Sequence, residues 1–176
     1  MAKQEIAYDE YFEQVNKILG TTGLLLASGA PEKPTNAMAI GWGILGKVWG
    51  RPMWVVLVRP SRFTYKVIEE TGDFTVNVPG ADLSKAVSYC GSHSGRDQNK
   101  LAELGLGVAA GREVGCGIIE ACPINYECQV VGKSDIVPEM LAEAVKREFY
   151  AQGDYHRVYF GQVLAAYADK KAAARL

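Results

Sequence analysis

The sequence predicts a mainly β domain, an antiparallel barrel with helices at its ends. Six or so segments have the alternation or apolar density of strands, and helical patterns interrupt them without a regular βα order. A doubly wound parallel sheet requires that order and fits poorly. The 176 residues suffice for one domain with a substantial core. We place this domain at residues 1–168 and expect a mobile C-terminal tail at 169–176.

The composition is that of an ordinary globular protein. Hydrophobic residues make up 48% of the chain, charged residues make up 22%, and the formal net charge is −1. This balance gives no electrostatic reason to bind nucleic acid or an anionic membrane. The N-terminus lacks the apolar segment of a secretory signal, and the apolar runs are too short to span a bilayer. We therefore expect a cytoplasmic protein.

Two motif searches give negative results. Cys116, Cys122 and Cys128 are spaced by six residues, Cys90 stands apart, and no C-x-x-C pair exists. We expect reduced, partly buried thiols and no metal site. The segment 105–110 superficially matches the dinucleotide fingerprint G-x-G-x-x-A. It follows a helical pattern instead of a strand, so we reject a Rossmann site.

The N-terminal third predicts one helix and three strands. Asp9 is the expected N-cap of the helix, and Gly20 is its expected end. In chain order we expect a helix at 10–19, strands at 22–28 and 35–42 joined by a turn at 29–34, a loop at 43–52 with two exposed bulky apolar residues, and a strand at 53–58. The strand at 35–42 has one face of small residues. Close approach of a flat group and tight packing of a helix both explain that face.

The turn after residue 58 concentrates polar side chains at the start of a helix. Ser61 is the expected N-cap of this helix, and Gly72 is its expected C-cap. Arg59, Arg62 and Thr64 lie beside Ser61, where a helix N-terminus offers free N–H groups and positive dipole. The combination suits a phosphate group. A well-capped surface helix with two solvated arginines explains the same residues.

The remaining chain predicts further strands broken by helices. In the strand at 73–79, Phe74, Val76 and Val78 share one face, and Asp73, Thr75 and Asn77 share the other. Beyond it we expect a helix from Asp82 to Gly91, a polar loop at 92–96, a short helix capped by Asp97, strands at 117–121 and 124–132, a helical segment at 138–150 and a final strand at 156–167.

The order of these motifs resembles the flavin reductase-like family of FMN-binding split barrels, in particular its flavoredoxin branch. The segments Arg59–Thr64, Asp73–Pro79 and Tyr89–Lys100 carry the resemblance, which extends roughly from Leu24 to Tyr167. It implies an antiparallel Greek-key split barrel with flanking helices. It also implies a homodimer that holds FMN in a groove at the subunit interface.

A residue-by-residue match implies a set of cofactor-binding residues. These are Arg59, Ser61, Arg62 and Thr64 at the phosphate, Asn36, Met38 and Ala39 beside the isoalloxazine, Asn77 near the flavin, and Ser94, Gly95, Arg96 and Lys100 over the ring and ribityl chain. The match places His156 near the nicotinamide side and makes it the candidate catalytic residue. Asn77 could instead terminate a strand, and His156 could equally be a structural hydrogen-bonding residue.

The resemblance implies a flavin reductase-type oxidoreductase that transfers hydride from NAD(P)H to FMN. The electrons would pass on to a small molecule or a redox protein. The alternatives are a flavoredoxin-like FMN electron carrier with little NAD(P)H activity and a split-barrel binding module without flavin. Two features depart from the family pattern. The segment Met38–Trp42 offers no hydroxyl where many members have Thr or Ser, and the helical segment at 138–150 replaces a plainer connection near the mouth.

Overall fold

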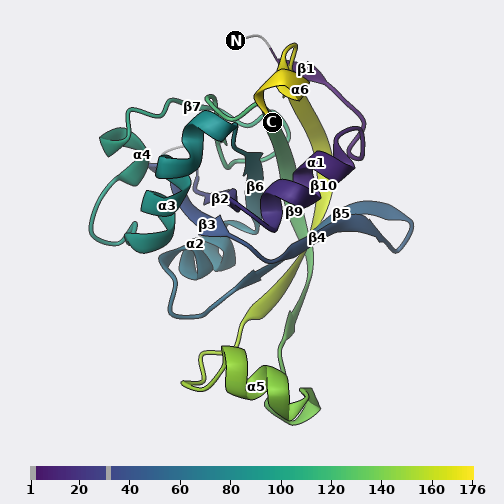
Figure 1. Ribbon diagram of the computed structural model, residues 1–176, viewed down its shortest axis with the longest axis vertical. Helices are drawn as coiled ribbons and strands as arrows, with labels where there is room; N and C mark the ends of the chain where they lie inside the picture. The colour runs from purple at the N-terminus through teal and green to yellow at the C-terminus, as the bar shows by residue number, and fades with distance from the viewer. Residues whose placement is uncertain (1–2, 31–32) are drawn as a thin grey trace.

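The computed structural model describes residues 3–30 and 33–176, and within them a single large antiparallel sheet is surrounded by helices (Figure 1). Residues 31 and 32 of the predicted turn, and residues 1 and 2 of the predicted domain, lie outside this description. The strands are β1 (Lys3–Glu5), β2 (Leu24–Ser28), β3 (Asn36–Ile40), β4 (Gly43–Val48), β5 (Arg51–Val58), β6 (Asp73–Val78), β7 (Val108–Ala109), β8 (Ile118–Ile119), β9 (Ile124–Asp135) and β10 (Arg157–Asp169). The helices are α1 (Phe12–Leu19), α2 (Phe63–Thr71), α3 (Ser84–Ser92), α4 (Lys100–Glu103), α5 (Glu143–Phe149) and α6 (Ala172–Arg175), with 3₁₀ turns at Ala81–Leu83 and Pro138–Met140.

The strand order of the sheet confirms the predicted fold class. The main sheet runs β3-β2-β6-β9-β10-β5-β4, with β1 paired to β10, and its pairings are antiparallel. Several neighbours in space are distant in sequence, as in a Greek key. The chain therefore forms a mainly β, antiparallel split barrel with flanking helices.

Strands β2 and β6 are buried on both faces because two apolar clusters lie on opposite sides of the sheet. Leu24 and Leu26 point into the larger cluster with Phe74, Val76 and Val78 of β6. The alternate residues of β2 pack into a second cluster with α3, α4 and the loop before β8. The face of β6 predicted from alternation is therefore confirmed, and its second face contacts protein instead of solvent.

The prediction of a loop at 43–52 is wrong, because these residues belong to the hairpin of β4 and β5. Trp49 and Gly50 both have positive φ, at 52° and 74°, which a two-residue hairpin turn requires. Pro52, the last residue of the expected loop, lies inside β5 opposite Lys47. Proline is tolerated near a strand's beginning when its missing N–H costs no ladder bond.

Four predicted helix starts differ from the structure, and one of them is α3, which begins at Ser84 and not at Asp82. Helix α1 begins at Phe12 without a side-chain cap, and α2 follows Arg62 without one. The Ser61 hydroxyl donates to Asp154 and so does not cap α2. Asn99, and not Asp97, caps α4 by accepting from the Ala102 N–H. The predicted C-cap is confirmed: Gly72 closes α2 in the left-handed conformation.

The end of the chain packs against the domain, so the expectation of a mobile tail is wrong. Strand β10 continues to Asp169, and the short helix α6 follows with Ala172 buried. Arg175 donates to the Asp169 carboxylate and to the Ala121 carbonyl. The Asp169 carboxylate, itself buried, also pairs with Lys3 of β1. These contacts join both ends of the described chain.

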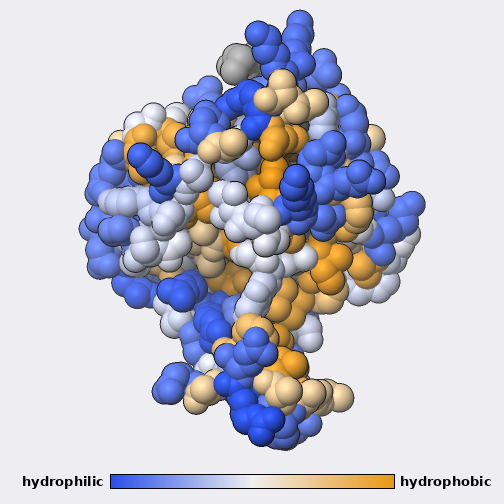
Figure 2. All heavy atoms as spheres, in the orientation of Figure 1, coloured by the Kyte–Doolittle hydropathy of each residue, from blue (hydrophilic) through white to orange (hydrophobic). Residues whose placement is uncertain are grey.

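Helix α5 lies in the connection between β9 and β10, at the end of the molecule away from α6 (Figure 1). Apolar side chains remain exposed around α5 and along the hairpin of β4 and β5. Orange atoms interrupt the polar surface of the molecule (Figure 2). Among the exposed large hydrophobics are Trp42, Ile44, Trp49, Met140 and Phe149.

The described residues contain four buried thiols and only short helices. The cysteines are all buried and unpaired, which is more complete burial than predicted. No group of three or more metal-ligating side chains gathers within residues 3–30 and 33–176. In the same part of the chain, no helix has the length and apolar character needed to cross a membrane.

Candidate functional site

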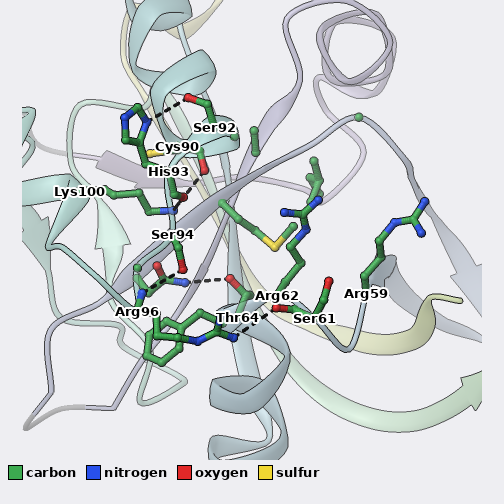
Figure 3. A pocket seen from close by; sticks show the side chains of 18 of the residues that line it. Arg59, Ser61, Arg62, Thr64, Cys90, Ser92, His93, Ser94, Arg96 and Lys100 are labelled. Atoms are coloured by element: carbon green, nitrogen blue, oxygen red, sulfur yellow. Dashed lines mark hydrogen bonds between the residues drawn. The ribbon is translucent and has the colours of Figure 1, made fainter. Parts of the chain in front are cut away.

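A cleft of about 370 Å³ lies where β3, the start of α2 and the loop after α3 meet (Figure 3). Twelve of the thirteen predicted site residues line it: Asn36, Met38, Ala39, Arg59, Ser61, Arg62, Thr64, Ser94, Gly95, Arg96, Lys100 and His156. Four of them carry positive charge, and no carboxylate belongs to the described lining residues. The cleft therefore favours an anionic ligand.

Asn77 is the predicted residue that the structure does not bring to the cleft. Its side chain is fully buried on the other side of β2. The amide group donates to the Leu25 carbonyl and accepts from the Ile119 N–H and from Asn125. All of its polar atoms therefore bond within the protein, and we correct its role to a structural one.

The start of α2 offers free donors to the cleft. Helices leave their first N–H groups without intrahelical acceptors, and the N–H groups of Phe63 and Thr64 have no backbone acceptor in the described chain. The Thr64 hydroxyl accepts from the Asn36 amide at 2.8 Å, so its own proton is free for another acceptor. Arg62 is exposed and forms no ion pair with any residue that the structure describes.

Asn36 also contributes an unpaired polar atom beside the cleft. Its side chain is 92% buried, and its side-chain oxygen has no hydrogen-bond partner. Gly95 packs directly against this oxygen, because a Cβ at position 95 would overlap it. A buried unpaired acceptor carries a desolvation cost that a ligand donor would remove. This orphaned atom fits a ligand that places a polar group beside β3 and Gly95.

Arg59 lines the cleft but donates to the main chain. Its terminal nitrogens donate to the carbonyl oxygens of Phe149, Gly153 and Asp154, at 2.8–3.3 Å. In Figure 3 the Arg59 side chain extends away from the other labelled residues. The structure therefore assigns Arg59 to holding the segment after α5. The donors left free for an anion are those of Arg62 and Thr64, because Ser61 already donates to Asp154.

The loop between α3 and α4 closes the opposite side of the cleft. Lys100 is almost fully buried and donates to the carbonyl oxygens of Cys90 and His93, which fastens the loop to the end of α3. Burial lowers the pKa of its ammonium group. Arg96 reaches back across the cleft and donates to the Ser61 carbonyl (Figure 3).

The small-residue face of β3 packs against α3 and also borders the cleft. Ala37 packs into the second apolar cluster with Val87 and Cys90 of α3. Ala39 lies next to Gly91, where an added Cβ would stand 3.2 Å from the Ala39 Cβ, and it also lines the cleft. Helix packing therefore requires small residues here, and the same residues leave room for a flat group.

His156 lies at an aromatic end of the cleft. The Tyr150 hydroxyl is 2.8 Å from its Nδ1, and the Trp42 ring packs against it at 5.2 Å. Burial, helped by the charge of Arg59, lowers the pKa of His156 to about 4. The imidazole is thus neutral near pH 7. Phe149 of α5 packs edge-on against Trp42, so α5 contributes to the mouth of the cleft.

Sequence reasoning missed Trp42, Tyr150 and Asp154 as parts of this site. Trp42 ends the small-residue strand and lines the cleft. Tyr150 and Asp154 precede His156 by a few residues and bond to site residues. The sequence Gly153-Asp154 marked a turn, but its contact with Ser61 joins positions 93 residues apart, which no local pattern reveals.

The fold and the cleft together define the class of the protein: an antiparallel split barrel with a cationic, ligand-sized cleft. Residues 20–176 match the family described as "Flavin reductase like domain". The chain belongs to this family.

Comparison with individual proteins agrees with this assignment. An uncharacterized protein of Archaeoglobus fulgidus is 36% identical over 107 residues, covering 61% of this chain and 59% of that protein, so less than two thirds of its length is matched. Flavoredoxin from Methanosarcina acetivorans has a TM-score of 0.68 at 27% identity, covering 85% of this chain and 69% of that one. An FMN-binding protein from Thermus thermophilus has a TM-score of 0.66 over 84% of this chain and 71% of that one. At 20% identity, that likeness shows the fold alone.

Proposed function

We propose that this protein binds FMN in the cleft and acts as a flavin reductase-type oxidoreductase. The observation that carries the proposal is the convergence of three separate sequence segments on one cleft with four cations and no carboxylate among its described lining residues. FMN is an anion with a flat ring, and both properties match this lining. The family and the FMN-binding protein among the structural neighbours support the same cofactor.

The residues divide into groups that suit different parts of FMN. Ser61, Arg62 and Thr64 supply the donors for the phosphate at the start of α2, and Arg96 adds charge from the opposite loop. Met38, Ala39 and the unpaired amide of Asn36 lie on the strand that would face the ring system. Bound FMN supplies the redox chemistry, taking up hydride from NAD(P)H and passing electrons to an acceptor.

His156 would act as a neutral hydrogen-bonding group beside the nicotinamide. With its pKa lowered to about 4, it carries no charge to compete with the cations of the phosphate end. If the Tyr150 hydroxyl donates to Nδ1, the remaining ring proton is on Nε2. Hydride transfer needs orientation and exclusion of water and requires no proton transfer by a side chain, so His156 and Trp42 would position the donor.

The proposal includes a homodimer with the cleft at the subunit interface. Trp42 and Phe149 expose apolar surface at the mouth of the cleft, and Met140 is exposed in the same connection as α5. A second subunit would cover this surface. The electron acceptor would be a small molecule or a redox protein. The cytoplasmic location expected from the sequence stays a prediction.

Replacing Arg62 tests the phosphate assignment. We expect Arg62→Gln to weaken FMN binding about tenfold and to leave riboflavin binding nearly unchanged, because only FMN has the phosphate. Flavin fluorescence quenching measures both affinities. Lys66→Gln is the matched control, since Lys66 is exposed one turn further along α2 and pairs only loosely with Glu70. Equal FMN affinity in the wild type and Arg62→Gln would refute the assignment.

Anaerobic mixing with NADH and NADPH distinguishes a reductase from an electron carrier. A reductase loaded with FMN loses its flavin absorption within a catalytically useful time, whereas a carrier such as a flavoredoxin stays oxidised. A purified protein that shows no flavin band after incubation with FMN would instead be a binding module. That outcome would overturn the proposed function as a whole.

A further inference from the structure

One carboxylate already occupies the donors at the phosphate end of the cleft. The Asp154 Oδ2 accepts from the Ser61 hydroxyl at 2.6 Å, and its Oδ1 accepts from the Ser61 N–H at 3.3 Å. Ser61 lines the cleft, while Asp154 stands just outside its described lining. These are the same N–H and O–H groups that the phosphate of FMN would use.

The backbone holds Asp154 in this position. Its φ is +54° and that of Gly153 is +73°, so both residues adopt the left-handed conformation. Aspartate and asparagine are among the few side chains that tolerate this conformation. Arg59 fixes the same turn by donating to the carbonyl oxygens of Gly153 and Asp154. The placement of the carboxylate on Ser61 therefore follows from the turn and its anchor.

Two anions cannot both use the Ser61 donors at full strength. The hydroxyl has one proton to donate, and two negative charges at hydrogen-bonding distance from one group repel each other. A phosphate that enters the cleft must displace the Asp154 carboxylate or share its donors. Arg62, which has no described ion-pair partner, supplies the charge that favours the phosphate.

We propose that Asp154 is a specificity-determining residue, which lowers the affinity of the cleft for phosphorylated flavin by competing for Ser61. The inference rests on the proposed function, because it assumes that FMN directs its phosphate to the start of α2. The preference for FMN over riboflavin is then set by Asp154 and Arg62 acting in opposite directions. Removal of the Asp154 charge strengthens FMN binding and leaves riboflavin binding unchanged.

The substitution Asp154→Asn tests the inference, because asparagine keeps the left-handed backbone and removes the charge. FMN affinity should rise about fivefold, in the range of an exposed charge interaction, and riboflavin affinity should change less than twofold. Glu148→Gln is the matched control: it removes an exposed carboxylate six residues earlier and should change neither affinity. In a Ser61→Ala background, the gain in FMN affinity from D154N should be smaller, because the shared hydroxyl is gone and only the shared N–H remains.

The outcomes separate the inference from the proposed function. Unchanged FMN affinity in D154N, or an equal gain for riboflavin, overturns the inference while FMN binding itself stands. Failure of the wild type to bind either flavin overturns the proposed function. In that case inorganic phosphate becomes the probe: it should raise the unfolding temperature of D154N more than that of the wild type. An equal rise in both proteins would then overturn the inference as well.

Discussion

Glu127 and Asp154 are carboxylates that both accept hydrogen bonds from main-chain N–H groups, and they differ in burial. Glu127 of β9 is fully buried and accepts from the N–H groups of Arg112, Glu113 and Val114, at 2.7–3.1 Å. Asp154 is exposed and accepts from the N–H and hydroxyl of Ser61. In both contacts a carboxylate accepts hydrogen bonds from N–H groups. The two contacts therefore differ mainly in whether water can reach the carboxylate.

The buried contact of Glu127 is part of the folded core, whereas water or a ligand can replace Asp154 in its exposed contact with Ser61. Loss of the Glu127 charge would leave several N–H groups of the loop before β8 without a partner in a place that water does not reach. Asp73, also buried, holds the same loop through the Gly115 N–H, and burial raises its pKa. At Ser61, water or a ligand can replace the carboxylate at little cost. The same kind of contact, a carboxylate that accepts main-chain N–H bonds, therefore stabilises the fold at Glu127. In our proposal, the contact at Asp154 selects the ligand.

Neutralising Glu127 should give the largest effect. We expect Glu127→Gln to lower the free energy of unfolding by about 3 kcal/mol, because its amide accepts fewer bonds and introduces buried donors. Urea denaturation measures the change. Glu113→Gln, an exposed carboxylate in the same loop, should change it by less than about 0.5 kcal/mol. Similar losses in the two variants would remove the distinction between buried and exposed carboxylates.

Removing the anchor of Asp154 should have an intermediate effect. Arg59→Met deletes the donors to three carbonyl oxygens, and we expect a loss of about 1.5 kcal/mol in the free energy of unfolding. Because Asp154 is then held less firmly on Ser61, the affinity ratio of FMN to riboflavin should rise as in D154N. Arg147→Met, at an exposed position of α5, is the control. A fall in that ratio would show that Arg59 binds the phosphate directly.

The effect of replacing His156 on stability should depend on pH. The folded protein holds the pKa of His156 at about 4, below its ordinary value of 6.5, so the unfolded chain takes up the proton first. This part of the stability is complete above pH 6.5 and is lost as pH falls toward 4. Thermal unfolding of the wild type and His156→Gln should therefore differ by a constant above pH 6.5 and converge below it. A constant difference down to pH 4 would contradict the burial of a neutral imidazole.

Local patterns predicted most of the cleft because its residues occur in short, contiguous motifs. The turn from Arg59 to Thr64 and the loop from Ser94 to Lys100 each supply several lining residues. The helix start that exposes N–H groups is likewise a local feature. Motif reading therefore found these groups, although it assigned Arg59 to an anion instead of to carbonyl oxygens.

The remaining features depend on contacts between distant segments. Alternation placed Asn77 correctly with Asp73 and Thr75, but only the pairing of β6 with β2 and β9 decides what covers that face. The hairpin of β4 and β5 was not predicted, because residues 43–52 were expected to form a loop that ends at Pro52. Only the pairing of the two strands defines the hairpin. The contact between Ser61 and Asp154 requires the long strands β9 and β10 to return the chain to α2.

The packing of Gly95 against Asn36 has a consequence for sequence variation in this family. Any side chain at position 95 would push the Asn36 amide aside, and that amide holds the Thr64 hydroxyl. Positions 36, 64 and 95 are therefore constrained as a unit, although they belong to a strand, a helix and a loop. Relatives that carry a larger residue at position 95 should also carry a smaller one at position 36, so the three positions should change together.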